Sequence, residues 1–264
     1  MNNNKVSKNK IVLQIVKIVV ITVLIFLIMF GIYKLVFYIL NSKNNSPWII
    51  NGTVNGKNSQ VITQDPKNEN SITLYRSDNQ EGGAVFSYSF WFAIENMEYK
   101  FNEWKHMLHK GNKTGNPNRS PGVFIHEKDN TLRIYMNTFT KLYEHVDIEN
   151  IPIKRWVHCV IVLNGKYLDV YINGFLRKRK ELEGIPKQNF GDLWLNLYGG
   201  FDGYLCRFRY FNYAIQPFMI EYLFNEGPAK QFDSSYKTGV TSSAPTLSPQ
   251  YWMTTGYPNT VGAP

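Results

Sequence analysis

Between residues 48 and 228 the chain alternates short apolar runs with turn signals. The runs are rich in aromatic and β-branched side chains, which is typical of strands. Eight runs are predicted strands: 86–94, 106–111, 122–128, 131–137, 156–164, 167–174, 193–199 and 203–212. Their regular spacing predicts an all-β sandwich of two antiparallel sheets. One helical segment is predicted over 216–224, because Pro217 suits its first position and Gly227 follows its end.

The N-terminal part has a different pattern. Residues 11–40 are almost continuously apolar, and they separate a basic segment at 1–10 from a polar linker at 41–47. We predict one transmembrane helix over 11–40, with Lys17 and Lys34 near its ends extending toward the lipid headgroups. The alternatives are a buried core helix and a cleaved signal peptide. The length of the run argues against the first, and the lack of a small-residue cleavage site argues against the second.

The positive charge of the chain is concentrated around this apolar run. The net charge is +9, but residues 1–43 hold six lysines and no acid, so the remaining residues carry 23 bases against 20 acids. A membrane therefore accounts for the excess better than a nucleic acid does. More lysines precede the run than follow it, which predicts a single-pass protein with its N-terminus on the cytosolic side.

The two ends of the sandwich region raise two further expectations. Residues 229–264 are rich in Ser, Thr, Pro and Gly, and we predict an extended tail that binds partner proteins through Tyr251, Trp252 and Tyr257. Cys159 and Cys206 both lie in apolar strand-like runs. Two buried free thiols are favoured over a disulfide between them.

A run of four cations follows the turn signal at Asn173-Gly174. A two-residue type I′ turn would pair Asp169 with Lys178, whereas a type I turn with a glycine bulge would pair Asp169 with Arg177. The second is preferred, because it also places Val170 opposite Leu176. The run is predicted to be a solvated edge strand, with an acidic partner surface as the alternative; its residues are Arg177, Lys178, Arg179 and Lys180.

The order of these runs resembles the concanavalin A-like lectin/glucanase superfamily, and specifically its laminin G-like domains. The most specific part is Trp156-x-His158 followed by Asn164-Gly165 and by Tyr171-Ile172-Asn173-Gly174. A strand from Gly203 and a helix before Gly227-Pro228 close the pattern. The resemblance covers residues 48–228 and implies a jelly-roll sandwich with one concave face.

The whole arrangement also resembles membrane-anchored virion proteins of large DNA viruses. That resemblance implies a non-enzymatic structural protein, a minor capsid-associated component that links an internal virion membrane to surrounding capsid proteins. Membrane lipid and other proteins of a large assembly are then its expected partners, and nucleic acid is not. The alternative is a glycan-binding adhesin presented on a membrane surface.

Candidate chemistry follows from the family. A glycan would stack on exposed aromatic side chains, for which the candidates are Tyr135, Tyr143, Tyr167, Trp194 and Tyr198. Calcium-binding relatives use clustered oxygen ligands, for which Asp202, Asp129 and Asn130 are the candidates; no other cofactor is expected.

No catalytic residue is predicted. The nearest match to the acidic pattern of glucanases is Glu144 with Asp147. In a strand their spacing would place them on opposite faces, and the stretch is in any case a predicted connecting loop. His106 and His109 have a spacing that suits metal ligands on a helix, but a regular strand would direct them to opposite faces.

Overall fold

The computed structural model describes residues 3–77 and 83–230, and the side chains of residues 14–38, 45–77 and 83–230. The chain divides into two units, residues 1–44 and residues 45–264. The predicted tail residues Tyr251, Trp252 and Tyr257 lie outside the described residues.

The first unit is formed by helix α1, which spans Asn3–Asn45 and so exceeds the predicted 11–40 at both ends. Its segment Gln14–Tyr38 has a mean hydropathy of 3.0. By length and composition this segment can cross a membrane, a criterion that an N-terminal signal sequence also meets. Lys17 and Lys34 lie near its two ends, as expected for side chains that reach the headgroups.

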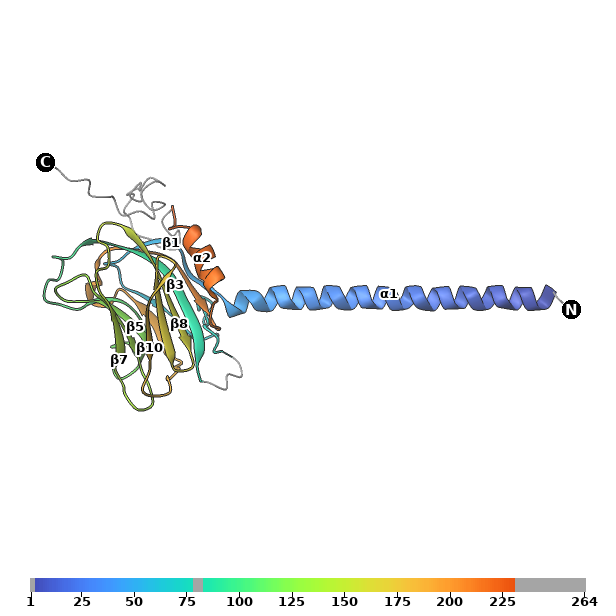
Figure 1. The fold of residues 1–264 in the computed structure, drawn as a ribbon, viewed down its shortest axis with the longest axis horizontal. Coiled ribbons are helices and arrows are strands. Elements are labelled where there is room, and N and C mark those ends of the chain that lie inside the picture. The colour runs from blue at the N-terminus through green and yellow to red at the C-terminus, as the bar shows by residue number, and fades with distance from the viewer. Residues whose placement is uncertain (1–2, 78–82, 231–264) are drawn as a thin grey trace. The chain divides into compact units, whose positions relative to one another are not determined.

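The second unit is a sandwich of two six-stranded antiparallel sheets (Figure 1). Sheet A has, in spatial order, β1 (Trp48–Asn55), β12 (Asp202–Phe211), β3 (Val85–Asn96), β8 (Trp156–Asn164), β9 (Tyr167–Ile172) and β10 (Phe175–Glu181). Sheet B has β2 (Gln60–Ile62), β11 (Asp192–Leu195), β4 (Lys105–Gly111), β5 (Arg119–Ile125), β6 (Leu132–Met136) and β7 (Glu144–Ile148). The all-β prediction is therefore confirmed.

The hydrophobic core lies between the two sheets. Alternate side chains of facing strands, such as Ile134 of β6 and Val170 of β9, are fully buried in it. A cluster of rings stiffens the part under β3 and β12, where Tyr88 and Tyr210 have centroids 5.0 Å apart. The core thus lies entirely within the second unit.

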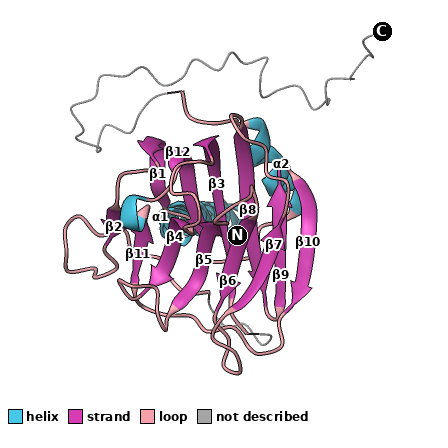
Figure 2. Ribbon diagram, turned by 90° about the vertical axis from the view of Figure 1, so that its left-hand side faces the viewer, coloured by secondary structure: helices cyan, strands magenta, loops and turns pink. Residues whose placement is uncertain are grey.

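Helix α2 (Pro217–Asn225) packs on the outer face of sheet A (Figure 2). Its Ile220 and Leu223 are buried against Val160 and Val162 of β8. Pro217 occupies the first turn and Gly227 follows the helix, as predicted. In the described part of the chain, no α-helix packs on the outer face of sheet B, and loops cover only part of that face, including His106 and His109.

Strands β1, β2 and β7 were not predicted. Strand β7 was expected to be a connecting loop, because Glu144-His145-Val146-Asp147 lies just before Ile151-Pro152. In the structure Glu144, Val146 and Ile148 point inward. Because one of these inward positions is a glutamate, the alternation of apolar and polar residues that marks a strand is not visible in the sequence. Only the fold shows that this carboxylate has hydrogen-bond partners inside the sandwich.

The preferred register of the β9–β10 hairpin is wrong. Asn173 and Gly174 form a two-residue turn with φ of 51° and 85°, and Ile172 pairs with Phe175. A bulge at Arg177 then shifts the register by one residue, so that Asp169 faces Arg179. A cation opposite Asp169 is confirmed, although it is neither of the two expected.

The cation run is an edge strand, as predicted, but its charges are largely engaged. Arg179 binds Asp169 through two hydrogen bonds of 2.7 Å. Lys178 and Lys180 donate to backbone carbonyls of β7 and so connect the edges of the two sheets. These contacts favour a structural role for the run over a free basic patch.

Cys159 and Cys206 are free thiols, and both are completely buried. Burial raises the pKa of each thiol well above its usual value. Both therefore remain protonated and unreactive in the folded domain.

Candidate functional site

The outer face of sheet B carries two rows of side chains that run across its strands. Alternation directs these residues outward, because their neighbours Val123, Ile134 and Leu193 belong to the core. Cross-strand pairing aligns Val61, Trp194, His109, Gly122, Tyr135 and His145 in the first row. It aligns His106, Phe124, Arg133 and Asp147 in the second.

Arg119 lies at the centre of an aromatic cluster on this face. Its guanidinium is 5.3 Å from the ring centroid of Phe124 and 4.9 Å from those of Tyr135 and Tyr143. These distances are typical of cation–π contacts. Gly122 leaves room for the arrangement, because a Cβ at that position would make a tight contact of 3.1 Å with Arg119 Cδ.

The rings of the cluster hold one another in place. Phe124 and Tyr135 meet edge to face at 5.6 Å, and Tyr135 lies 5.6 Å from the imidazole of His145. The Tyr143 hydroxyl donates to the side-chain oxygen of Asn116. The cluster is therefore a preformed surface with aromatic edges and polar tips.

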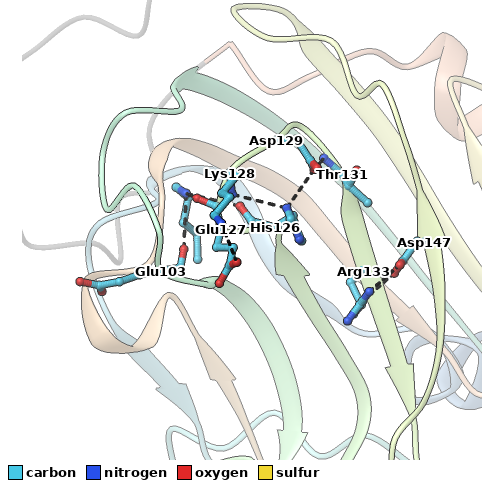
Figure 3. A network of polar contacts seen from close by, with 9 residues as sticks. Glu103, His126, Glu127, Lys128, Asp129, Thr131, Arg133 and Asp147 are labelled. Atoms are coloured by element: carbon cyan, nitrogen blue, oxygen red, sulfur yellow. Dashed lines mark hydrogen bonds and ion pairs between the residues drawn. The ribbon is translucent and has the colours of Figure 1, made fainter.

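An ion pair borders the cluster on β6 and β7 (Figure 3). Arg133 donates two hydrogen bonds to Asp147, of 2.7 Å and 2.6 Å, and its guanidinium is 4.8 Å from the ring centroid of Trp104. Partial burial alone would raise the pKa of Asp147, but these hydrogen bonds hold it below its usual value. Asp147 is therefore an ionised partner of Arg133 and not a proton donor.

His106 and His109 lie on the same face, contrary to expectation. A bulge places both Met107 and Leu108 opposite Val123, so His109 returns to the face of His106. His106 Nε2 and His109 Nδ1 are 2.6 Å apart. A regular strand would have separated them, and the bulge has no clear signature in the sequence.

The two imidazoles connect backbone groups of separate loops. Leu197 N donates to His106 Nδ1, and His109 Nε2 donates to the carbonyl of Asn112 at 2.7 Å. These bonds require His106 Nε2 to donate its proton to His109 Nδ1. Each imidazole then carries a single proton and is neutral. Burial lowers the pKa of both, so the neutral form persists at physiological pH.

The five candidate aromatic residues are divided by the fold. Tyr135, Tyr143 and Trp194 belong to the outer face of sheet B. Tyr167 is on β9 of sheet A, where Arg179 lies over its ring. Tyr198 is in the turn Leu197–Gly199 between β11 and β12.

The candidate calcium ligands each have another partner. Asp202 forms an ion pair of 2.8 Å with Lys57. In the turn between β5 and β6, Asp129 accepts from Thr131 N (Figure 3). Asn130 donates to the Ile151 carbonyl. Among the described residues, no three His, Cys, Asp or Glu side chains are grouped to hold a metal ion.

Glu144 and Asp147 point to opposite faces of β7, as predicted. Glu144 is buried beneath the sheet, where it accepts hydrogen bonds from Thr138 Oγ1, Glu183 N and Gly184 N. Asp147 is held by Arg133 on the outer face. A glycoside hydrolase needs two carboxyl groups on either side of one glycosidic bond, and these two cannot provide that arrangement.

Arg119 and Phe124, at the centre of the cluster, were not among the predicted site residues. Phe124 and Arg133 alternate with core residues along their strands. Treating 122–125 and 132–136 as strands would therefore have predicted that both side chains lie on the same outer face as Tyr135. Arg119 had no such signal, because its position over the rings depends on tertiary contacts, including a hydrogen bond from its Nε to the Gly115 carbonyl.

Sequence comparison identifies the family. A family model described as the concanavalin A-like lectin/glucanases superfamily matches residues 66–220. The chain belongs to this superfamily. No curated protein matches the chain.

Two solved structures resemble the chain at low sequence identity. A crystal structure of a mutant of HCR/D has a TM-score of 0.50 and 15% identity, over 70% of this chain and 52% of that one. The botulinum neurotoxin serotype D ligand binding domain, in complex with N-acetylneuraminic acid, has a TM-score of 0.49 and 14% identity, again over 70% and 52%. The present chain spans about half the length of these proteins, and at this identity the likeness is one of fold.

Proposed function

We propose that this protein is a non-enzymatic, single-pass membrane protein whose concanavalin A-like domain binds a glycan through the outer face of sheet B. Helix α1 is the anchor, with its N-terminus on the cytosolic side. The observation that carries the proposal is the cluster of Arg119 with Phe124, Tyr135 and Tyr143. In this cluster one guanidinium lies over three aromatic rings on the outer side of sheet B.

The cluster has the chemistry that sugar recognition requires. A pyranose ring has an apolar face of C–H groups that packs on an aromatic ring, and a rim of hydroxyl groups that need hydrogen-bond partners. Tyr135 and Tyr143 offer rings with polar tips, and Arg119 offers donors that also suit a carboxylate or sulfate. The proposed ligand is therefore a glycan, with acidic sugars preferred over neutral ones.

Binding without catalysis is supported by the state of the acids. Glu144 points into the core, and Asp147 is held ionised by Arg133. Neither carboxyl group is free to protonate a leaving group or to attack a sugar.

The test is binding of the purified full-length protein, in detergent micelles, to a panel of neutral and acidic glycans. We expect Arg119→Ala and Tyr143→Ala each to weaken binding by about five- to thirtyfold, since each loses about 1–2 kcal/mol of contact energy. Tyr198→Ala is the matched control, because Tyr198 is an exposed tyrosine in the β11–β12 turn, outside the Arg119 cluster, and its loss should leave affinity unchanged.

Two outcomes would contradict the proposal. One is the absence of binding to every glycan on the panel by a folded protein. The other is binding that survives Arg119→Ala and Tyr143→Ala but is lost with Tyr198→Ala, which would move the site away from the Arg119 cluster.

The capsid-associated role inferred from the architecture stays a prediction. It would use the tail at 229–264 to contact neighbouring proteins, and those residues are almost all outside the described part. Cross-linking of the native assembly, followed by mass spectrometry, would identify the partners.

A further inference from the structure

One end of the sandwich exposes large apolar side chains. This surface, called here the loop end, is formed by the β6–β7 loop (137–143), the β10–β11 loop (182–191) and residues 75–77. Phe139 is 70% exposed and Phe190 is 78% exposed, with Ile185 also exposed between them in sequence. Apolar side chains grouped in this way mark a contact surface.

Hydrogen bonds fix the loops that carry these side chains. Phe139 N donates to the Ile185 carbonyl at 2.9 Å, and Lys187 N donates to the Asn137 carbonyl at 2.8 Å. Buried Lys110 donates to the carbonyls on either side of Phe190, those of Asn189 and Gly191. The exposure of Phe139 and Phe190 is therefore built into the fold.

Each of the two phenylalanines has a cation beside its ring. Lys187 Nζ is 5.0 Å from the ring centroid of Phe139, and the guanidinium of Arg76 is 5.2 Å from that of Phe190. The nearby acid Glu183 is engaged by Lys141 at 2.9 Å. An aromatic ring with an adjacent cation suits a phospholipid surface, where the ring enters the acyl boundary and the cation meets a phosphate.

The chain leaves the sandwich for the apolar helix at this same end. Asn212 N donates to the Asn45 carbonyl, and the Asn212 side chain donates to the carbonyl of Arg76, the residue that lies over Phe190. The apolar segment ends at Tyr38, so Asn45 lies only seven residues further along the chain. Seven residues span at most about 25 Å when fully extended.

We propose that the loop end contacts the headgroup region of the membrane in which the protein's own helix is anchored, with Phe139 and Phe190 inserted and Lys187 and Arg76 bound to lipid phosphates. This inference rests on the membrane anchor proposed above. The short chain between Tyr38 and Asn45 keeps this end near the bilayer, so a lipid surface is the partner that is always within reach.

The experiment labels single positions with an environment-sensitive fluorophore and measures quenching by lipid. Phe139→Cys and Phe190→Cys provide the test positions. The matched control is Phe175→Cys, because Phe175 is also 70% exposed but lies at the opposite end, after the β9–β10 turn. Native Cys159 and Cys206 are fully buried and are not expected to react.

Each labelled full-length protein is reconstituted into vesicles of phosphatidylcholine with one fifth phosphatidylserine, with or without brominated phosphatidylcholine as the quencher. We expect at least twofold stronger quenching at 139 and 190 than at 175. Adding Lys187→Glu and Arg76→Glu to the labelled proteins should reduce the quenching at 139 and 190, because repulsion from phosphate withdraws the loop end.

Alkaline extraction of the vesicles separates the two ways to fail. Release of the protein into the supernatant overturns the membrane anchor itself. A protein that stays in the vesicles but shows equal quenching at all three positions, or strongest quenching at 175, overturns the contact by the loop end and leaves the anchor intact.

Discussion

Individual buried side chains determine how this domain responds to pH. His158 stacks on Trp91 with ring centroids 5.0 Å apart, and its Nε2 is 2.9 Å from Ser89 Oγ. Its Nδ1 is buried without a hydrogen-bond partner. Burial lowers the pKa of His158 to about 3, so the imidazole stays neutral in the fold.

Stability should therefore fall in mild acid. Between about pH 6.5 and pH 3 the unfolded chain binds a proton at His158 that the folded chain does not, so protonation favours unfolding as the pH decreases. At pH 5.5 this one residue should cost about 1.4 kcal/mol relative to pH 8. His106 and His109 have lowered pKa values and add to the effect with the same sign.

Urea unfolding at pH 8 and pH 5.5, followed by tryptophan fluorescence, measures this loss. In His158→Gln the difference between the two pH values should shrink by about 1.4 kcal/mol. His145→Gln is the control, because the imidazole of His145 is half-exposed on sheet B. An unchanged pH dependence in His158→Gln would show that the folded domain accommodates a charged His158.

Connections between elements depend on a few buried polar contacts. Glu144 connects strand β7 to the β6–β7 loop and to the β10–β11 loop. It accepts three hydrogen bonds, of 2.8 Å, 2.9 Å and 3.2 Å. Burial alone would raise the pKa of Glu144, but the hydrogen bonds from Glu183, Thr138 and Gly184 hold it below its usual value. The carboxylate thus stabilises the loop end as an ion.

Glu144→Gln should destabilise the domain by about 2 kcal/mol. The amide that replaces one carboxylate oxygen cannot accept a hydrogen bond, so at least one buried donor loses its partner. Thermal unfolding of the full-length protein in micelles measures the change. Glu149→Gln, at the exposed end of the same region, should stay within about 0.5 kcal/mol of the wild type, and an equal loss in both variants would refute the role of Glu144.

The same elements show what the sequence could and could not predict. Alternation and turn residues located eight strands and helix α2, because those patterns depend on each segment alone. The register of β10 and the common face of His106 and His109 depend on bulges at Arg177 and Met107. A bulge changes the direction of every later side chain in its strand, and pairing with the neighbouring strand determines where it falls.

At the scale of the whole molecule, the chain joins an apolar helix to a domain with its own core. The core residues run from Ile49 to Tyr210, all beyond the helix. Strand β1 closes the edge of sheet A by pairing with β12, from Trp48 opposite Arg209 to Asn55 opposite Tyr204. Folding of the sandwich should therefore require β1 but not α1.

A fragment of residues 45–230 is expected to be soluble and to unfold cooperatively, because it keeps both sheets and α2 while losing the exposed apolar segment. A fragment of residues 60–230 is the comparison. It lacks β1 and so leaves β12 with an unpaired edge and an uncovered Phe208, and it should aggregate or unfold at least 10 °C lower. Size-exclusion chromatography and circular dichroism during heating distinguish these results. Aggregation of the longer fragment would contradict the division of the chain into an anchor and an independent sandwich. Equal stability of both fragments would show that folding of the sandwich does not require β1.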